Sequence, residues 1–380
     1  MIGQAMGSNN IVILHNIVTP YRNALFSEIA RIHDDFKVIF IAETEIPRDW
    51  IIDKGNMQYD YEILYRKPLE SINKLNLVAR TFSSLRKLNA KVLIIAGYDS
   101  PAFWTALLWK RLYRRKAIIL SASNEEDRRR IFLREMLKRR FIRNCDAAIV
   151  YGSKGREYIR KLGMCPGRIF LMGNSVDNEF YWKKSAEFRL EKHALRKELA
   201  LRKVNILYVG RFSKEKNLIF LLDCINSLPV DDKKVCGLVM VGSGPLMGEV
   251  QDYVQKHNMK NVYLAGFKQK EELALYYGIC DVLVLPSLSE TWGLVVNEAM
   301  ASGLPIIVSR RCGCYPDIIK EGINGFSFDP HNKEELMNHI SNMVKGVYDL
   351  KGMGKASRSI IDEYSPAKTA ERLLEAVGSI

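Results

Sequence analysis

LVLPSLSETWGLVVNEAMASGLPIIVS, residues 283–309, contains the pattern of one strand–helix–strand unit. An apolar strand is followed by a serine-rich turn, a helix expected to begin near Gly293, and a second strand at 304–309. Two acids, Glu290 and Glu298, stand eight positions apart, and Glu298 lies in an otherwise apolar run. An unpaired carboxylate in a dry environment is strongly unfavourable, so Glu298 requires a partner.

The same alternation of short apolar runs and helix-patterned segments extends along the whole chain. Ile- and Val-rich runs occur at 11–14, 37–42, 91–96, 117–121, 146–150 and 168–172, and again at 204–210, 236–242, 261–266, 281–286, 304–309 and 325–330. A charged stretch at 181–203 separates the two sets. This alternation is typical of parallel sheets with helices on both faces. It predicts an α/β protein with two tandem Rossmann-like, doubly wound domains, joined near residues 175–190, whose strand ends face a central cleft.

Length and composition agree with a globular protein of this kind. A chain of 380 residues suggests about two domains, and 47% hydrophobic residues exclude extensive disorder. No apolar run reaches the roughly 18–20 residues of a membrane-spanning helix, and the polar start lacks the pattern of a signal peptide. The seven cysteines are scattered, with a single C-x-C at 312–314, so we expect reduced thiols in a cytosolic protein rather than a zinc site.

The positive charge is concentrated in one segment, residues 110–143, called the basic segment below. The formal net charge is +14, and most of the excess lies in the first half of the chain. Such a segment attracts phosphates, anionic lipid headgroups or nucleic acid, although it is also compatible with solvated helix faces. The basic residues are interleaved with, or close to, apolar and aromatic ones: Trp104, Trp109, Tyr113, Ile131, Phe132 and Phe141. This mixture favours a domain lying on an anionic membrane leaflet.

Nucleic-acid binding would also fit the charge. The sequence shows no stacking platform and no recognised nucleic-acid-binding module, so we expect no nucleic-acid partner. A gel-shift assay would test for nucleic-acid binding and so decide between a nucleic-acid partner and a membrane partner.

In the second half, the loop GRFSKEKN (210–217) follows a strand and carries two cations. Gly210 allows the backbone to turn, and Arg211 and Lys216 supply a planar fork and a point charge, which together suit a diphosphate. The alternative is an ordinary basic surface loop. The next strand ends at Gly242, in a tight turn that only partly matches a dinucleotide-binding fingerprint.

The helix in the opening stretch offers a second anion-binding element. Its first amides, at Gly293 and Leu294, form a positive end suited to phosphate. Glu290 precedes the helix and can reach the group attached to that phosphate. Glu298 lies about 7 Å beyond Gly293 along the helix and can accept hydrogen bonds from two ribose hydroxyls. Alternatively, Glu298 pairs with an arginine of the other domain. The loop Phe267-Lys268 is placed to meet a flat base through its backbone.

In this order and spacing, GRFSKEKN, VMVGSGP, NVYLAGF and PSLSETWGLVVNEAMASGLPIIVS resemble the family 4 glycosyltransferases. The E-x7-E signature of that family matches Glu290 and Glu298. The resemblance implies the GT-B fold, with an acceptor-binding domain at 1–178 and a nucleotide-sugar-binding domain at 179–364. A C-terminal helix at about 365–380 is then expected to pack back on the first domain.

The resemblance also implies roles for individual residues. Arg211, Lys216 and Glu290 match the catalytic residues that contact the donor diphosphate and the transferred sugar. The matching donor-binding residues are Gly210, Gly242, Phe267, Lys268, Gly293, Leu294 and Glu298.

The implied activity is transfer of a sugar, with retention of anomeric configuration, from a nucleotide sugar to a saccharide or lipid-linked saccharide. A UDP-sugar is favoured as donor over a GDP-sugar, and the setting would be polysaccharide or glycolipid biosynthesis at the inner face of the plasma membrane. There is no strict D-x-D motif, so we expect no divalent metal and no other cofactor. The alternatives are a GT-B epimerase or phosphorylase and a non-catalytic nucleotide-sugar-binding paralogue.

Candidates for the acceptor side lie after strands of the first half. They are Pro20, Tyr21 and Arg22 in an expected turn, Tyr98 in GYDSPAFW, and Ser123, Glu125, Glu126 and Asp127 in SASNEED. The last group also fits a simpler interpretation, an N-cap and first-turn acids for a basic helix at 128–143. Asn174 and Asp177 are expected to hold the connection between the domains, and His15 to make a local hydrogen bond at a strand end.

Overall fold

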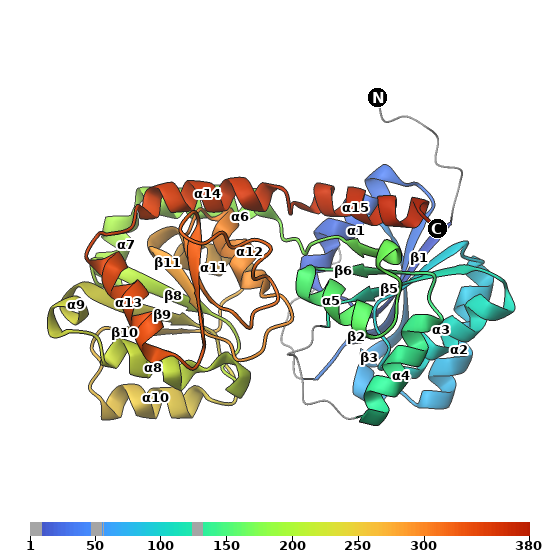
Figure 1. Ribbon diagram of the computed structural model, residues 1–380, viewed down its shortest axis with the longest axis horizontal. Helices are drawn as coiled ribbons and strands as arrows, with labels where there is room; N and C mark the ends of the chain where they lie inside the picture. The colour runs from blue at the N-terminus through green and yellow to red at the C-terminus, as the bar shows by residue number, and fades with distance from the viewer. Residues whose placement is uncertain (1–9, 47–54, 56, 124–131) are drawn as a thin grey trace. The chain divides into compact units, whose positions relative to one another are not determined.

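The computed structural model describes residues 10–46, 55, 57–123 and 132–380. The chain forms two compact units (Figure 1). The first unit runs to Val176 and also includes Pro366–Ile380, and the second spans Asp177–Ser365. The boundary therefore falls two residues before the expected position after residue 178, and the C-terminal segment belongs to the first unit.

The first unit is built on a parallel sheet with strand order β3-β2-β1-β4-β5-β6-β7. Its strands are β1 (Ile11–Ile17), β2 (Phe36–Thr44), β3 (Asp60–Pro68), β4 (Val92–Ile95), β5 (Lys116–Ser121), β6 (Ala147–Val150) and β7 (Ile169–Leu171). Its helices are α1 (Pro20–Ile32), α2 (Lys74–Leu88), α3 (Pro101–Leu112), α4 (Phe132–Arg143), α5 (Ser153–Lys161) and α15 (Pro366–Gly378). The central strands are almost wholly buried, as expected for parallel strands covered on both faces.

Two features of the first unit differ from the sequence prediction. Strand β3, DYEILYRKP, was not predicted, because charged and apolar residues are interleaved and only Leu64 is fully buried in this edge strand. The residues Pro20, Tyr21 and Arg22 do not form a turn but the first turn of α1, with Pro20 at its first position. Proline is suited to that position because its fixed φ angle is already helical and its missing N–H is not needed there.

The second unit contains a parallel sheet with strand order β10-β9-β8-β11-β12-β13. Its strands are β8 (Val204–Val209), β9 (Cys236–Val241), β10 (Val262–Gly266), β11 (Val282–Leu285), β12 (Ile306–Ser309) and β13 (Gly325–Phe328). Its helices are α6 (Asn178–Leu190), α7 (Lys192–Glu198), α8 (Leu218–Asn226), α9 (Val230–Val235), α10 (Met247–Lys256), α11 (Lys270–Ile279), α12 (Leu294–Ala301), α13 (Lys333–Val344) and α14 (Leu350–Asp362). The predicted pair of doubly wound parallel sheets is therefore confirmed.

Each sheet has one point at which the strand order reverses. In the first unit it lies between β1 and β4, and in the second between β8 and β11. Ligands of open parallel sheets bind at the carboxyl ends of the strands at such a point, because the two connecting loops diverge there. The loops after β8 and β11 contain the two strongest sequence motifs of the second half.

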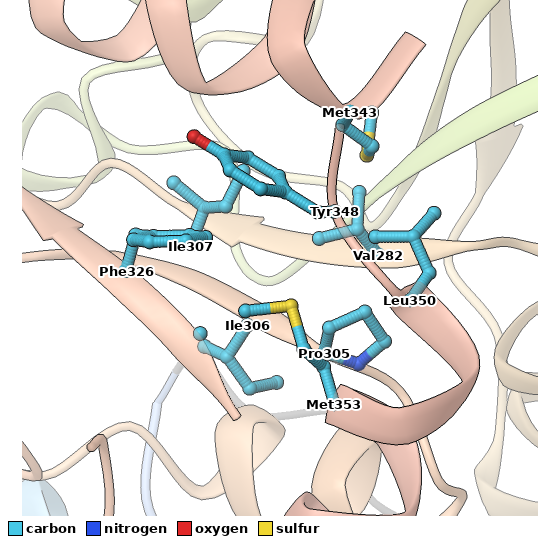
Figure 2. Close-up of a pocket in the computed structure, with 10 residues that line it drawn as sticks. Val282, Pro305, Ile306, Ile307, Phe326, Met343, Tyr348, Leu350 and Met353 are labelled. Atoms are coloured by element: carbon cyan, nitrogen blue, oxygen red, sulfur yellow. The ribbon is translucent and has the colours of Figure 1, made fainter. Parts of the chain in front are cut away.

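The core of the second unit contains a small cavity below β12 and β13 (Figure 2). Its volume is about 10 Å³ and its walls are apolar, with Ile306, Phe326 and Met353 among the residues that line it. A space of this size holds at most one water molecule and offers it few polar partners. It is a packing feature and not a ligand site.

Candidate functional site

The loops after β8 and β11 contact each other at the reversal point of the second sheet. The backbone N–H of Leu288 donates to the carbonyl oxygen of Glu215 at 2.8 Å. Beside this bond the ammonium of Lys216 forms an ion pair with the carboxylate of Glu290, and the two side chains are only 15% and 16% exposed. Two residues that sequence analysis selected from separate motifs are thus in direct contact.

Glycines bring the neighbouring loops close together. The N–H of Gly210 donates to Val241 at 3.0 Å, and the N–H of Gly242 donates to Gly266 at 2.8 Å. A Cβ atom on Gly242 would lie 1.9 Å from the carbonyl oxygen of Gly210, so only glycine fits at this position. The turn predicted at Gly242 therefore serves to pack the loop after β9 against the loop after β8.

Arg211 differs from Lys216 in its lack of an ion pair with the described acids, although its charge helps to lower the pKa of Glu215. Its side chain is exposed and, within the described residues, makes no ion pair or hydrogen bond. Its backbone is fixed, because the carbonyl oxygen accepts a hydrogen bond of 3.2 Å from the buried Tyr208 hydroxyl. The loop after β8 thus presents one cation to solvent and holds the other against Glu290.

Helix α12 begins at Leu294, shortly after Glu290, and presents its amino end at the same edge of the sheet. Gly293 is its N-cap, with φ at +98°, a conformation that favours glycine. No side chain caps this helix, so its first amides, beginning with Leu294, are not satisfied by a capping group. Backbone donors and the helix dipole together favour an anion at this position.

Glu298 lies on α12 between two tyrosines of the same unit. The Tyr277 hydroxyl on α11 donates to its carboxylate at 2.7 Å, and Tyr181 on α6 is a second hydrogen-bond partner. Burial raises the pKa of Glu298 to about 7, although both tyrosine hydrogen bonds act in the opposite direction. Within the second unit the carboxylate is already satisfied by these two tyrosines, and its alternative pairing with an arginine of the other domain stays a prediction.

The loop after β10 stands apart from this group. Phe267 is half-exposed, and Lys268 pairs with Glu272 of α11 at 3.1 Å. The ion pair of Lys268 is thus with the helix that follows its own loop. The predicted contact of Phe267 and Lys268 with a base through backbone atoms stays a prediction.

In the first unit, the loops after β4 and β5 meet through a hydrogen bond of 2.7 Å between the Tyr98 and Ser123 hydroxyls. The acceptor-side candidates Glu125, Glu126 and Asp127 lie outside the described residues. Among the candidates that the structure describes, Tyr98 and Ser123 are the pair that it brings together.

Arg22 is buried and holds loops of the first unit together. Its guanidinium donates to Asn174 Oδ1 at 3.1 Å and to the Tyr151 hydroxyl. Asn174 therefore has a structural contact, and Asp177 has another, since it caps α6 by accepting from the Phe180 N–H at 3.1 Å. Each contact lies within its own unit, and the expected role of the two residues in holding the connection between the domains stays a prediction.

Two further predictions concern single groups. His15 makes the expected local contact, with Nδ1 at 3.0 Å from the Ile17 carbonyl oxygen, and burial lowers its pKa to about 3. Tyr21 lies in the first turn of α1 beside Arg22, whose guanidinium lies 5.3 Å from the centre of the Tyr21 ring.

No metal site is found in the part of the chain that the structure describes. No group of three or more His, Cys, Asp or Glu side chains is arranged to hold an ion there. Cys312 and Cys314 are buried and form no disulfide. Arg211 and Lys216 are two described cations at this edge of the sheet.

The basic segment is only partly arranged as its sequence suggested. Trp109 and Phe141 are completely buried, so they are wrong as membrane-contacting residues, and Ile131 lies outside the described residues. Phe132 is 85% exposed, and the other large exposed apolar side chains of this region are Leu108, Leu112, Tyr113, Leu133, Met136 and Leu137. None of the described helices has the length and apolar character needed to cross a bilayer.

Comparison with known proteins agrees with the resemblance noted in the sequence. Residues 191–360 match the family described as glycosyl transferases group 1. The match includes the loops after β8 and β11, and with them Arg211, Lys216, Glu290 and Glu298.

Two curated relatives illustrate the similarity. A sulfoquinovosyl transferase of Arabidopsis thaliana is 32% identical over 55% of this chain and 40% of its own length. An alpha-monoglucosyldiacylglycerol synthase of Acholeplasma laidlawii is 26% identical over 62% of this chain and 60% of its own length. The chain thus aligns with less than two thirds of the length of either relative.

Among solved structures, HepE of Anabaena in complex with UDP and glucose has a TM-score of 0.76 to this chain. The identity is 15%, and the alignment covers 97% of this chain and 100% of that one. This likeness shows a shared fold, the GT-B arrangement of two Rossmann-like sheets predicted from the sequence.

Sequence reasoning missed Tyr181 and Tyr277. The two rings contact each other at 5.7 Å between centroids, and both hydroxyls are directed at Glu298. Neither tyrosine belongs to a recognisable motif. Tyr181 is also 117 positions away from Glu298 along the chain. The sequence provides only indirect evidence for them. A carboxylate within an apolar run, such as Glu298, needs hydrogen-bond donors from other parts of the chain.

Proposed function

We propose that this protein is a glycosyltransferase that moves a sugar from a nucleoside-diphosphate sugar to a saccharide or lipid-linked saccharide. The observation that carries the proposal is the contact between Lys216 and Glu290 at the reversal point of the second sheet, inside the family-matched region. A cation for the diphosphate and an acid for the sugar are next to each other there, beside the uncapped start of α12.

Each group at this site has a proposed task. Arg211, Lys216 and the first amides of α12 balance the negative charge that develops on the leaving diphosphate, which is commonly the largest catalytic contribution. Glu290 binds the transferred sugar, and Glu298 accepts hydrogen bonds from the ribose. Gly210 and Gly242 allow backbone to approach the nucleotide.

The proposed reaction retains the anomeric configuration. The bond from the anomeric carbon to the diphosphate oxygen breaks while the acceptor hydroxyl oxygen bonds to the same face of that carbon. The leaving diphosphate takes the hydroxyl proton, so no separate protein base and no metal ion is needed. On the acceptor side, Tyr98 and Ser123 are the described groups proposed to meet the acceptor.

The donor and acceptor classes rest on relatives as well as on geometry. HepE, which shares the fold, binds UDP and glucose, and this supports UDP over GDP for the donor. A sulfoquinovosyl transferase and an alpha-monoglucosyldiacylglycerol synthase are relatives with glycolipid-related names, which supports a lipid-linked acceptor and a role in glycolipid or polysaccharide biosynthesis.

A panel of nucleoside diphosphates, followed by turnover assays, tests the proposal. We expect UDP to raise the melting temperature most, because a ligand at 100 times its Kd adds about 2.7 kcal/mol to the free energy of unfolding. We also expect turnover of a UDP-sugar to continue in excess EDTA. Protection by no nucleoside diphosphate would exclude the proposed function. Turnover without any acceptor would favour an epimerase or phosphorylase, and binding without turnover a non-catalytic paralogue.

The exposed face of α3 and α4 supports a second part of the proposal, peripheral binding to the cytoplasmic leaflet of an anionic membrane. Exposed apolar side chains of these helices, including Phe132, Leu133 and Met136, alternate with exposed arginines such as Arg134 and Arg139. Apolar groups enter the headgroup region while the arginines bind anionic lipids, so the two contributions add.

Flotation with anionic liposomes measures this interaction. We expect binding at low salt that weakens at high salt, because screening removes the electrostatic part. Replacing Phe132 by serine should lower the partition coefficient about tenfold, the effect of losing one buried aromatic ring. Leu190→Ser is the control, since Leu190 on α6 is equally exposed, at 89%, in the other unit. Equal losses in both variants, or no flotation at low salt, would contradict membrane binding through this face.

A further inference from the structure

The first unit contains an open groove between α2 and α3 that none of the steps above uses. Its volume is about 510 Å³, within the range of roughly 300–1,000 Å³ typical of ligand pockets. The residues that line it are Val78, Asp99, Ser100, Pro101, Trp104, Thr105 and Leu108. Its walls are therefore largely apolar, and its polar groups come mainly from the short segment at the start of α3.

Exposed apolar side chains of the same helices flank the groove without lining it. Leu108 lines the groove, and Leu112, one turn further along α3, is exposed beside it. On α2, Val78 lines the groove, and the exposed Leu75 lies one turn before it. Exposed arginines follow at Arg111 and in α4. An apolar channel that opens on a surface of apolar and basic residues complements the chain of an anionic lipid better than it complements a neutral, polar partner.

The polar end of the groove is tied to the candidate acceptor site. Trp104, which lines the groove, donates its indole N–H to the Tyr98 carbonyl oxygen at 3.0 Å, and the Tyr98 hydroxyl bonds Ser123. Asp99 and Ser100 follow directly and face the groove. A molecule with its hydrocarbon chain in the groove would therefore have its head group beside the loop after β4, at the reversal point of the first sheet.

From this arrangement we infer that the groove between α2 and α3 binds the hydrocarbon chain of a lipid-linked acceptor and so places its sugar beside Tyr98, Asp99 and Ser100. The inference rests on the proposed transfer to a lipid-linked saccharide. It adds a site for the lipid chain and a reason for preferring long-chain acceptors. The Asp99 carboxylate can accept hydrogen bonds from sugar hydroxyls, and the Ser100 hydroxyl can donate or accept them.

Binding of the fluorescent fatty acid 11-(dansylamino)undecanoate to the full chain tests the groove directly. We expect saturable fluorescence enhancement, at least tenfold weaker binding for Leu108→Glu, and no binding of dansylglycine, which has the fluorophore but no chain. A carboxylate in an apolar groove opposes an apolar chain, whereas the same change outside it does not. Leu112→Glu is the matched control, with the same charge on the same helix and similar exposure of the wild-type residue, 61% against 55% for Leu108. It should change the Kd less than twofold.

A second pair of variants separates filling of the groove from charge. Val78→Phe should narrow the groove and weaken binding of the probe severalfold, and Leu75→Phe, one turn away on α2, should not. Equal effects within either pair, or no saturable binding to the wild type, would overturn the groove assignment. Stabilisation by UDP is measured on the same preparations. If UDP does not stabilise the wild-type protein but the dansyl probe binds, only the proposed function is refuted. If UDP stabilises the protein but the dansyl probe does not bind, only the groove assignment is refuted.

Discussion

Replacing Arg211 by alanine is expected to lower kcat about 100-fold or more and to leave the melting temperature unchanged. The side chain is exposed and has no ion pair or hydrogen bond within the described part of the chain, so its removal costs only a solvent-screened attraction to Glu215. Its proposed task is to balance charge on the leaving diphosphate, and removing one such group typically costs about 3–4 kcal/mol in the transition state. The loss should therefore appear in kcat rather than in stability.

Lys214→Ala is the matched control for this experiment. Lys214 is an exposed cation in the same loop, three residues from Arg211, and it has no proposed contact with the donor. Steady-state kinetics with a UDP-sugar and differential scanning calorimetry give the two readouts. Turnover of Arg211→Ala within threefold of wild type, or equal losses in the two variants, would remove Arg211 from the site.

The second large effect is expected from separating Lys216 and Glu290. Lys216→Met removes a cation from the diphosphate site and leaves the mostly buried Glu290 carboxylate without that partner. We expect kcat to fall by about two orders of magnitude or more and the free energy of unfolding to fall by about 1–3 kcal/mol, the range for a buried polar group that loses its partner.

The double variant Lys216→Met/Glu290→Gln distinguishes the catalytic from the structural part of this effect. Removing both charges should restore much of the lost stability, because no uncompensated charge remains, but it should restore no activity. Thermal unfolding and kcat, measured for both single variants and the double variant, form a complete cycle. Recovery of activity in the double variant would show that the two residues act only as a structural pair.

The two parallel sheets could be predicted because their central strands are continuous apolar runs, such as IVIL at 11–14 and DVLVLP at 281–286. That pattern has few alternatives when helix-patterned segments lie between the runs. Strand β3 was not predicted, because edge strands are half-exposed and carry charged residues. The apolar run that identifies a central strand is therefore missing from it. The turn expected at Pro20 was wrong because proline suits both a turn and the first position of a helix.

The candidate site was predicted at the level of its loops but not of its contacts. Sequence spacing indicates that Lys216 and Glu290 each follow a strand, but their ion pair depends on β8 and β11 being neighbours, which chain order alone does not determine. The tyrosine partners of Glu298 come from α6 and α11 and could be recognised only once those helices were placed beside α12. Burial of Trp109 and Phe141 similarly depends on the packing of α3 and α4, since both residues occur among charges in the sequence.

Helix α15 has a consequence for the order in which the protein matures on the ribosome. Its buried residues, among them Leu373 and Leu374, cover α1 and the strands β6 and β7, although they are synthesised after the entire second unit. The earlier part of the first unit therefore leaves the exit tunnel with an apolar surface that no nearby segment can cover. Nascent chains stalled before residue 366 should accordingly keep this apolar surface exposed and recruit chaperones. This is expected even though all residues of the second unit have been synthesised by then.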